Sequence, residues 1–300
     1  MAIAWVFPGQ GSQKVGMADQ AMTLSGANER FALASELLGR DLLAICRRED
    51  ADQSDDPLLN LNDTRNTQPA LFVVESLLVD NLLKQGREAT LVAGHSLGEL
   101  VALYAAGVFD LETGLRLMKT RSELMASAGS GAMTALIGFD RNQLDELVAQ
   151  TDGVSIANDN SDAQVVISGS PEAVERVSGA LKCKRAIPLA VSGAFHSPFM
   201  AEAAERFAAE LDNVPFLDAR VPVLSNSAAS ASTSADELKQ RLKQQMTTGV
   251  RWRETMAAMT DSGVDIVVEI GPGNVLSGLA KRSMSGVTTA QIGGAGDLGQ

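Results

Sequence analysis

The sequence has few cysteines and no long apolar run, and both absences narrow its class. Cys46 and Cys183 are the only 2 cysteines among 300 residues. They are too few for a disulfide framework, so we expect reduced thiols. No apolar stretch approaches the roughly 20 residues that a membrane span requires. The first residues lack the basic segment of an export signal. We therefore expect a cytoplasmic protein that does not bind a membrane.

Positive charge is also scarce. The chain has 25 lysines and arginines against 37 aspartates and glutamates, a formal net charge of −12. Such a surface repels a phosphate backbone, so we expect no nucleic-acid partner. Apolar residues make up 45% of the chain. That content can fill a large core in one big domain or two unequal ones, and we expect a monomer.

The segment LVAGHSLGELVALYAAG, at 91–107, places a serine between two glycines. Leu91–Ala93 has the pattern of a short buried strand, and Leu97–Ala106 has apolar residues at helical spacing. A strand, a sharp turn and a helix form the setting in which Ser96 becomes an exposed nucleophile. The backbone N–H of Leu97 would then point into the site from the start of the helix. The alternative is a small residue where a strand meets a helix.

Strand and helix patterns alternate along both ends of the chain, which predicts an α/β fold with a mostly parallel sheet. From Ala132 onward the order becomes strand, helix, strand, strand, helix, strand, which is the ferredoxin-like arrangement. Glycine-containing segments at 129–131 and 192–193 flank this part. We predict a large domain formed by 1–127 and 191–300, with a ferredoxin-like domain at 128–190 inserted in it. Any site should lie in the cleft between them.

A serine nucleophile needs a base, and the chain has only 2 histidines. His95 adjoins Ser96 on the turn, where neighbouring side chains diverge, so it is poorly placed to take the Oγ proton. By elimination the base is His196, although a lone histidine is more often structural. No aspartate or glutamate stands out as a third member, and a backbone carbonyl could orient the imidazole instead. Acylation should then fall as the pH drops through the pKa of His196, ordinarily about 6.5.

Several motifs follow one another in a characteristic order. They are FPGQGSQ at 7–13, GHSLGE at 94–99, the Arg121 helix with GAM at 131–133, ANDNS at 157–161, GAFHSP at 193–198, VRW at 250–252 and EIGPGNVL at 269–276. In this order the chain resembles the malonyl-CoA:acyl-carrier-protein transacylases of bacterial fatty acid synthesis over nearly its whole length. The resemblance implies an α/β-hydrolase-like large domain and a ferredoxin-like small one, in agreement with the architecture inferred above.

The resemblance also implies roles for particular residues. Ser96 would be the nucleophile and His196 its base. Gln10 would supply a backbone N–H that pairs with the N–H of Leu97 as an oxyanion hole. Arg121 would bind the malonyl carboxylate.

Further roles come from the same resemblance. The side chain of Gln245 would help to orient the histidine, with Gln244 as the neighbouring alternative. Phe195 accompanies malonyl rather than methylmalonyl selectivity in related domains, where it would crowd the α-carbon. The chain departs from the family at Asp159, where a tyrosine or phenylalanine often stands between two asparagines.

The partners implied by the resemblance are malonyl-CoA and acyl carrier protein. The phosphopantetheine is carried by that partner, so no cofactor and no metal are expected. Two other hypotheses compete with the transferase. The same turn would serve a thioesterase of the α/β-hydrolase class, and a non-catalytic module could bind the carrier protein without reacting.

Overall fold

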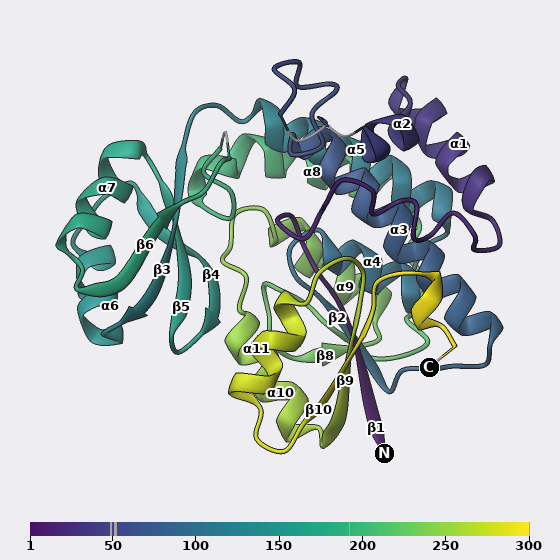
Figure 1. The fold of residues 1–300 in the computed structure, drawn as a ribbon. Helices are drawn as coiled ribbons and strands as arrows, with labels where there is room; N and C mark the ends of the chain where they lie inside the picture. Colours follow the sequence, from purple (N-terminus) through teal and green to yellow (C-terminus); the bar gives the residue numbers. More distant parts are fainter. Residues whose placement is uncertain (49, 51–52, 192, 300) are drawn as a thin grey trace.

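The computed structural model describes residues 1–48, 50, 53–191 and 193–299, which form two lobes (Figure 1). The large lobe is built on a six-stranded sheet in the order β10-β9-β1-β2-β7-β8. Its strands are β1 (Ala2–Phe7), β2 (Leu91–Gly94), β7 (Val223–Leu224), β8 (Ala231–Ser232), β9 (Val264–Ile270) and β10 (Thr288–Ile292). Neighbouring strands run parallel except β7 and β8. The prediction of a mostly parallel α/β sheet is therefore confirmed.

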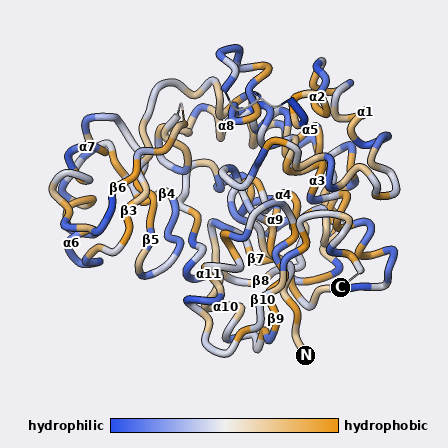
Figure 2. The backbone as a smooth tube through the Cα atoms, viewed as in Figure 1, coloured by the Kyte–Doolittle hydropathy of each residue, from blue (hydrophilic) through white to orange (hydrophobic). Residues whose placement is uncertain are grey.

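Helices cover both faces of this sheet. Successive side chains of a strand point to opposite faces, so apolar strands need a helical layer on each side. On β1, Trp5 and Phe7 belong to one apolar core, while Ala4 and Val6 belong to another. The first core also contains residues of α1 (Ala27–Leu38), α2 (Leu42–Arg47), α3 (Thr64–Lys84), α4 (Gly98–Ala105), α5 (Leu111–Ser127), α8 (Ala201–Asp212) and α9 (Ala235–Gln244). The second core contains residues of α10 (Trp252–Asp261) and α11 (Val275–Ser283). The central strands appear hydrophobic in Figure 2.

Local residues set several of these element boundaries. Gly39, with a φ of 68°, ends α1 in the left-handed conformation that glycine adopts readily. Ser234 begins α9, since its side chain accepts a hydrogen bond from the N–H of Glu237.

The small lobe contains β3 (Ala132–Phe139), α6 (Arg141–Ala149), β4 (Val154–Ser161), β5 (Gln164–Gly169), α7 (Pro171–Ala180) and β6 (Cys183–Pro188). This is the element order that the sequence predicted. The strands pair antiparallel in the order β4-β5-β3-β6. A separate core, with Leu136, Val165 and Ile167 among its members, lies within this lobe. The ferredoxin-like name and the bounds 128–190 stay predictions.

Polar contacts join strand β4 of the small lobe to the large lobe. Asn158 and Val250 form a parallel bridge. Asp159 pairs with Arg141 and with Arg253, each with a shortest N–O distance of 2.9 Å. Burial would raise the pKa of Asp159, but the two guanidinium groups outweigh this effect and lower it. The unusual acidic residue is thus a paired anion that holds β4 against α10. Ser192, in the segment at 192–193 that flanks the small lobe, lies outside the described residues.

The turn between β2 and α4 depends on two glycines that lie against other backbone atoms. A Cβ on Gly94 would lie 1.8 Å from the carbonyl oxygen of Gly98, and a Cβ on Gly98 would lie 2.2 Å from that of Phe7. These atoms are backbone, so they cannot move aside as a flexible side chain would. The small residues at this turn are therefore required by the close approach of the chain to itself.

We predict that Gly98→Ala destabilises the protein by about 1–3 kcal/mol, the usual cost of overpacking a rigid site. Gly179→Ala on α7 is the matched control, because a Cβ there meets nothing within 4 Å. The control should be slightly more stable than the wild type, since alanine favours a helix more than glycine does. Urea unfolding followed by circular dichroism compares the two. Equal midpoints for both variants would contradict the prediction.

Candidate active site

Most of the site residues singled out from the sequence line one cavity between the two lobes. It opens at the carboxyl ends of β1 and β2, where parallel α/β sheets commonly place their sites. The lining consists of Gln10, Gln68, His95, Ser96, Leu97, Arg121, Met125, Met133, Asn158, Leu189, Val191, Phe195 and His196. Both lobes contribute to this list, as expected for a site in the cleft.

Ser96 lies on the turn that links β2 to α4, and its φ of 56° is left-handed. Such a conformation is strained for a residue that carries a Cβ. His196 has the same feature, with a φ of 55°. They are the only non-glycine residues with positive φ in the described part of the chain. Strained backbone of this kind concentrates at functional sites, where the surrounding structure holds it in place.

Ser96 and His196 contact each other directly. Ser96 Oγ lies 2.7 Å from His196 Nε2, and His196 Nδ1 lies 2.9 Å from the carbonyl oxygen of Gln245. A carbonyl can only accept, so Nδ1 carries the proton and Nε2 is free to accept the hydroxyl proton of Ser96. This is the geometry of a serine activated by a general base.

The third member of this arrangement is a backbone carbonyl, one of the two alternatives that the sequence left open. The expectation that the side chain of Gln245 orients His196 is wrong. Gln245 is the C-cap residue of α9, where helix carbonyls have no partner within the helix. Its carbonyl is therefore available to the imidazole, while its side chain points elsewhere.

The side chain of Gln245 joins three other groups of the site. Its Nε2 donates to the carbonyl oxygen of Ser96 at 2.8 Å and to Glu99 Oε2 at 2.7 Å. Its Oε1 accepts from Arg121 Nη2 at 2.8 Å. Gln245 is fully buried, and it is the residue of the glutamine pair that reaches the site. Gln244 belongs to helix α9 itself.

Arg121 is a fully buried cation on α5. Besides Gln245, its guanidinium donates to Gln68 Oε1 at 2.6 Å and to Ser96 Oγ at 3.2 Å. All these acceptors are neutral. Burial lowers the pKa of Arg121 to about 10, against the opposing effect of Glu99. The group stays protonated at neutral pH, so its charge is available to an anion that enters the cavity.

Gln68 was not singled out from the sequence as a site residue. It lies on α3, and its Nε2 donates to Thr64 Oγ1 at 2.7 Å. Thr64 in turn donates to Gln10 Oε1 at 2.8 Å. A chain of hydrogen bonds thus links the guanidinium of Arg121 to the loop after β1. A helical pattern alone cannot reveal it, because the partners are far apart in the sequence.

The two expected oxyanion donors are Gln10 and Leu97, which both line the cavity. Neither backbone N–H donates to an acceptor among the described residues. Leu97 lies at the N-terminus of α4, where helix N–H groups have no partner within the helix. Both N–H groups are therefore unpaired donors beside the cavity, as an oxyanion hole requires.

His95 points away from the proton on Ser96. Its Nε2 lies 2.8 Å from Asn160 Oδ1 of the small lobe, and its ring lies against Trp252, with centroids 5.5 Å apart. Burial lowers the pKa of His95, and the hydrogen bond that it makes to Asn160 Oδ1 only partly opposes this. The exclusion of His95 as the base therefore agrees with its contacts.

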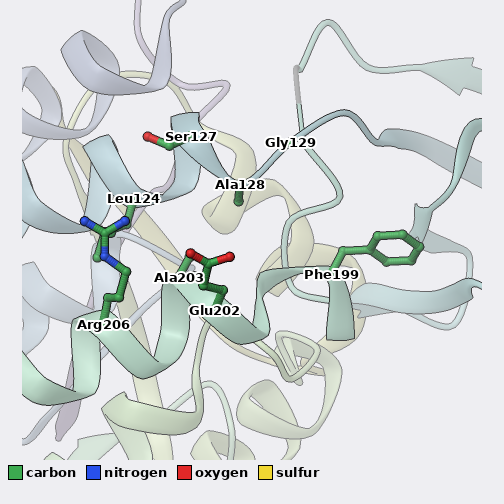
Figure 3. Close-up of a pocket in the computed structure, with 8 residues that line it drawn as sticks. All are labelled: Leu124, Ser127, Ala128, Gly129, Phe199, Glu202, Ala203 and Arg206. Atoms are coloured by element: carbon green, nitrogen blue, oxygen red, sulfur yellow. The ribbon is translucent and has the colours of Figure 1, made fainter.

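Helix α5 also borders a second cavity, on the side of α8 (Figure 3). Leu124 and Ser127 line it from α5, and Glu202 and Arg206 line it from α8. None of the catalytic or substrate-binding residues predicted from the sequence lines it. No three His, Cys, Asp or Glu side chains of the described residues gather where they could hold a metal ion. None of the described helices has the length and apolar character of a membrane span.

The family model described as "acyl transferase domain" matches residues 4–295. The chain belongs to this acyltransferase family. A malonyl CoA-acyl carrier protein transacylase of Synechocystis is 48% identical over 298 residues, which cover 99% of this chain and 99% of that protein. The family named from the sequence motifs is thereby confirmed.

Solved structures of family members agree with the fold of this acyltransferase. The crystal structure of Synechocystis malonyl-CoA:ACP transacylase has a TM-score of 0.94 at 48% identity and covers 100% of this chain and 99% of its own. A malonyl-transacylase in complex with its type II PKS acyl-carrier protein has a TM-score of 0.90 at 38% identity. It covers 99% of this chain and 98% of its own.

The pKa of His196 changes the expected pH dependence. Burial and the positive charge of Arg121 lower this pKa from 6.5 to about 3, although the carbonyl of Gln245 opposes the shift. The neutral imidazole is the base, so the acylation rate should stay nearly constant from about pH 5 to 8 and fall only at lower pH. Burial thus corrects the expectation of a loss near pH 6.5.

Rapid-quench acylation by a thioester substrate at several pH values measures this profile. His196→Ala should lose the reaction at every pH, while His95→Ala should lose less. A wild-type inflection near the ordinary histidine pKa would contradict the burial of His196.

Proposed function

We propose that this acyltransferase transfers the malonyl group from malonyl-CoA to the phosphopantetheine thiol of acyl carrier protein, through a malonyl ester on Ser96. It thereby supplies malonyl groups to fatty acid biosynthesis. One observation carries the proposal: Ser96 Oγ lies 2.7 Å from the base His196 and 3.2 Å from the buried cation of Arg121. A nucleophile and an unpaired cation in one cavity fit an acyl group that ends in a carboxylate.

The first half of the reaction forms the ester. Ser96 Oγ attacks the thioester carbonyl while its proton passes to His196 Nε2. The carbonyl oxygen becomes an oxyanion that the N–H groups of Gln10 and Leu97 stabilise, each worth roughly 2.7–4 kcal/mol. When the intermediate collapses, the C–S bond breaks and His196 returns the proton to the thiolate of coenzyme A.

The second half releases the ester to the carrier protein. The phosphopantetheine thiol gives its proton to His196, and its sulfur attacks the ester carbonyl. The C–O bond to Ser96 breaks, and the serine regains its proton from His196. These proton transfers use only the chain's own residues, so the proposed reaction needs no cofactor. The scheme predicts ping-pong kinetics.

Other parts of the assignment rest on the same family likeness. We assign the small lobe to the ferredoxin-like class and place Phe195, which lines the cavity, beside the α-carbon of the acyl group. We also propose that the protein works as a monomer in the cytoplasm. The match to a transacylase solved with its acyl-carrier protein supports the choice of partner.

A covalent adduct tests the transferase directly. After mixing with malonyl-CoA alone, intact-mass spectrometry should show one added malonyl group, and Ser96→Ala should show none. Adding carrier protein should then remove the adduct and load the carrier. Release of free malonate at the same rate without an acceptor would favour a thioesterase instead. The absence of any adduct on the wild type would leave only a binding role.

We predict that Arg121→Ala abolishes the preference for malonyl over acetyl thioesters. Hydrogen bonds to a charged group contribute about 1.5–3 kcal/mol each, so two correspond to a preference of about a hundredfold or more. Arg121→Ala should lose this factor for malonyl-CoA while sparing acetyl-CoA. Arg121→Lys should recover only part, because an ammonium lacks the planar fork. The measurement is the ratio of the two kcat/KM values, and an equal loss for both substrates would make Arg121 structural.

A further inference from the structure

Asn226 is a buried asparagine beside the turn that carries Ser96. It follows β7 by two residues, and β7 pairs in parallel with β2 through Val92–Val223 and Ala93–Leu224. Beyond this point β2 turns into the elbow and leaves the sheet. The peptide groups around Ser96 therefore lose the strand that would have paired with them.

The side chain of Asn226 makes hydrogen bonds that a neighbouring strand would otherwise make. Its Nδ2 donates to the carbonyl oxygen of Gly94 at 2.6 Å, and its Oδ1 accepts from the N–H of Ser96 at 2.7 Å. An amide side chain has one donor side and one acceptor side, as a peptide group does. The carbonyl and the N–H that it faces allow only one orientation of this amide.

Two hydrogen bonds of its own backbone hold Asn226 in place. Its N–H donates to Glu99 Oε2 at 3.1 Å, and its carbonyl accepts from the N–H of Arg251 at 3.2 Å. Glu99 Oε2 also accepts from Gln245, whose side chain binds the carbonyl oxygen of Ser96. Both peptide groups of Ser96 are thus bound by the side chains of two buried residues, and each of these residues also donates to Glu99 Oε2, Asn226 through its backbone and Gln245 through its side chain.

We propose that Asn226 is a positioning residue for acylation of Ser96. Its two hydrogen bonds hold Ser96 in the left-handed conformation, which keeps Oγ at 2.7 Å from His196 Nε2. The proposal rests on the transferase function described above. It goes beyond that function because Asn226 contacts neither the acyl group nor the reacting atoms and acts only through the backbone of Ser96.

The informative substitution is Asn226→Asp, which keeps the shape and the acceptor of the side chain. A carboxylate cannot donate to the carbonyl of Gly94, whereas a protonated carboxyl can. Burial and the adjacent Glu99 hold the new pKa above the usual value for aspartate. The nearby positive or titratable groups do not pair with the new carboxyl. Arg121 and His196 are separated from it by Gln245 and Ser96, and the side chain of Arg251 pairs with Glu254.

Single-turnover acylation at a series of malonyl-CoA concentrations gives the rate constant and the Kd separately. For Asn226→Asp the rate constant should be about a hundredfold below wild type at pH 8, the size expected when a reacting group is displaced by about 1 Å. It should rise as the pH falls toward 5, while the wild type stays flat. The Kd should stay within about twofold, because the contacts of Arg121 are retained.

Two further variants separate positioning from folding. Asn226→Ala lacks donor and acceptor, so its rate constant should be low at every pH. Asn213→Asp makes the same change beside an exposed carbonyl, that of Ala209, and should react like the wild type. Thermal unfolding shows whether each variant is folded at the assay temperature.

The outcomes divide as follows. Wild-type protein that is not acylated by malonyl-CoA would overturn the proposed function itself. Wild-type protein that is acylated, with Asn226→Asp equally fast and equally flat from pH 5 to 8, would overturn the role of Asn226 alone. A weaker Kd with an unchanged rate constant would also overturn it, since positioning acts on the rate.

Discussion

The close approach of the chain to itself at the elbow is the constraint on which the site depends. Gly94 and Gly98 lie against backbone oxygens, so β2 can end in a turn that leaves no space for a side chain at either position. That turn places Ser96 at the edge of the sheet, opens the N-terminus of α4 toward the cavity and sets Asn226 beside the peptide groups that it binds. A displacement here would move Ser96 and the backbone N–H of Leu97 together.

A second requirement is that the small lobe keeps its position against this edge of the large-lobe sheet. Strand β4 reaches the large lobe through the Asn158–Val250 bridge and the ion pair of Asp159 with Arg253. The same strand brings Asn160 to His95. The cavity has walls from two lobes because β4 is bound at three successive residues.

Much of the fold and part of the site could be predicted from local sequence patterns. The elbow, the parallel sheet and the order of elements in the small lobe follow from apolar periodicity and turn residues, which act over short distances. His196 followed from elimination, since the chain has so few histidines. The roles of Gln68, Glu99 and Asn226 could not be predicted this way. Their partners are distant in the sequence, and only the folded chain shows which buried amide meets which charge.

The charge of Arg121 has an effect on His196 that reaches beyond substrate binding. Burial, and after it this cation, lower the pKa of His196, so part of the loss of basicity is due to Arg121. An acyl chain that ends in a carboxylate cancels part of the positive charge, which restores proton affinity to the imidazole. An uncharged acyl chain leaves the imidazole as it was. In the proposed reaction, an anion bound at Arg121 would therefore also strengthen the base that activates Ser96.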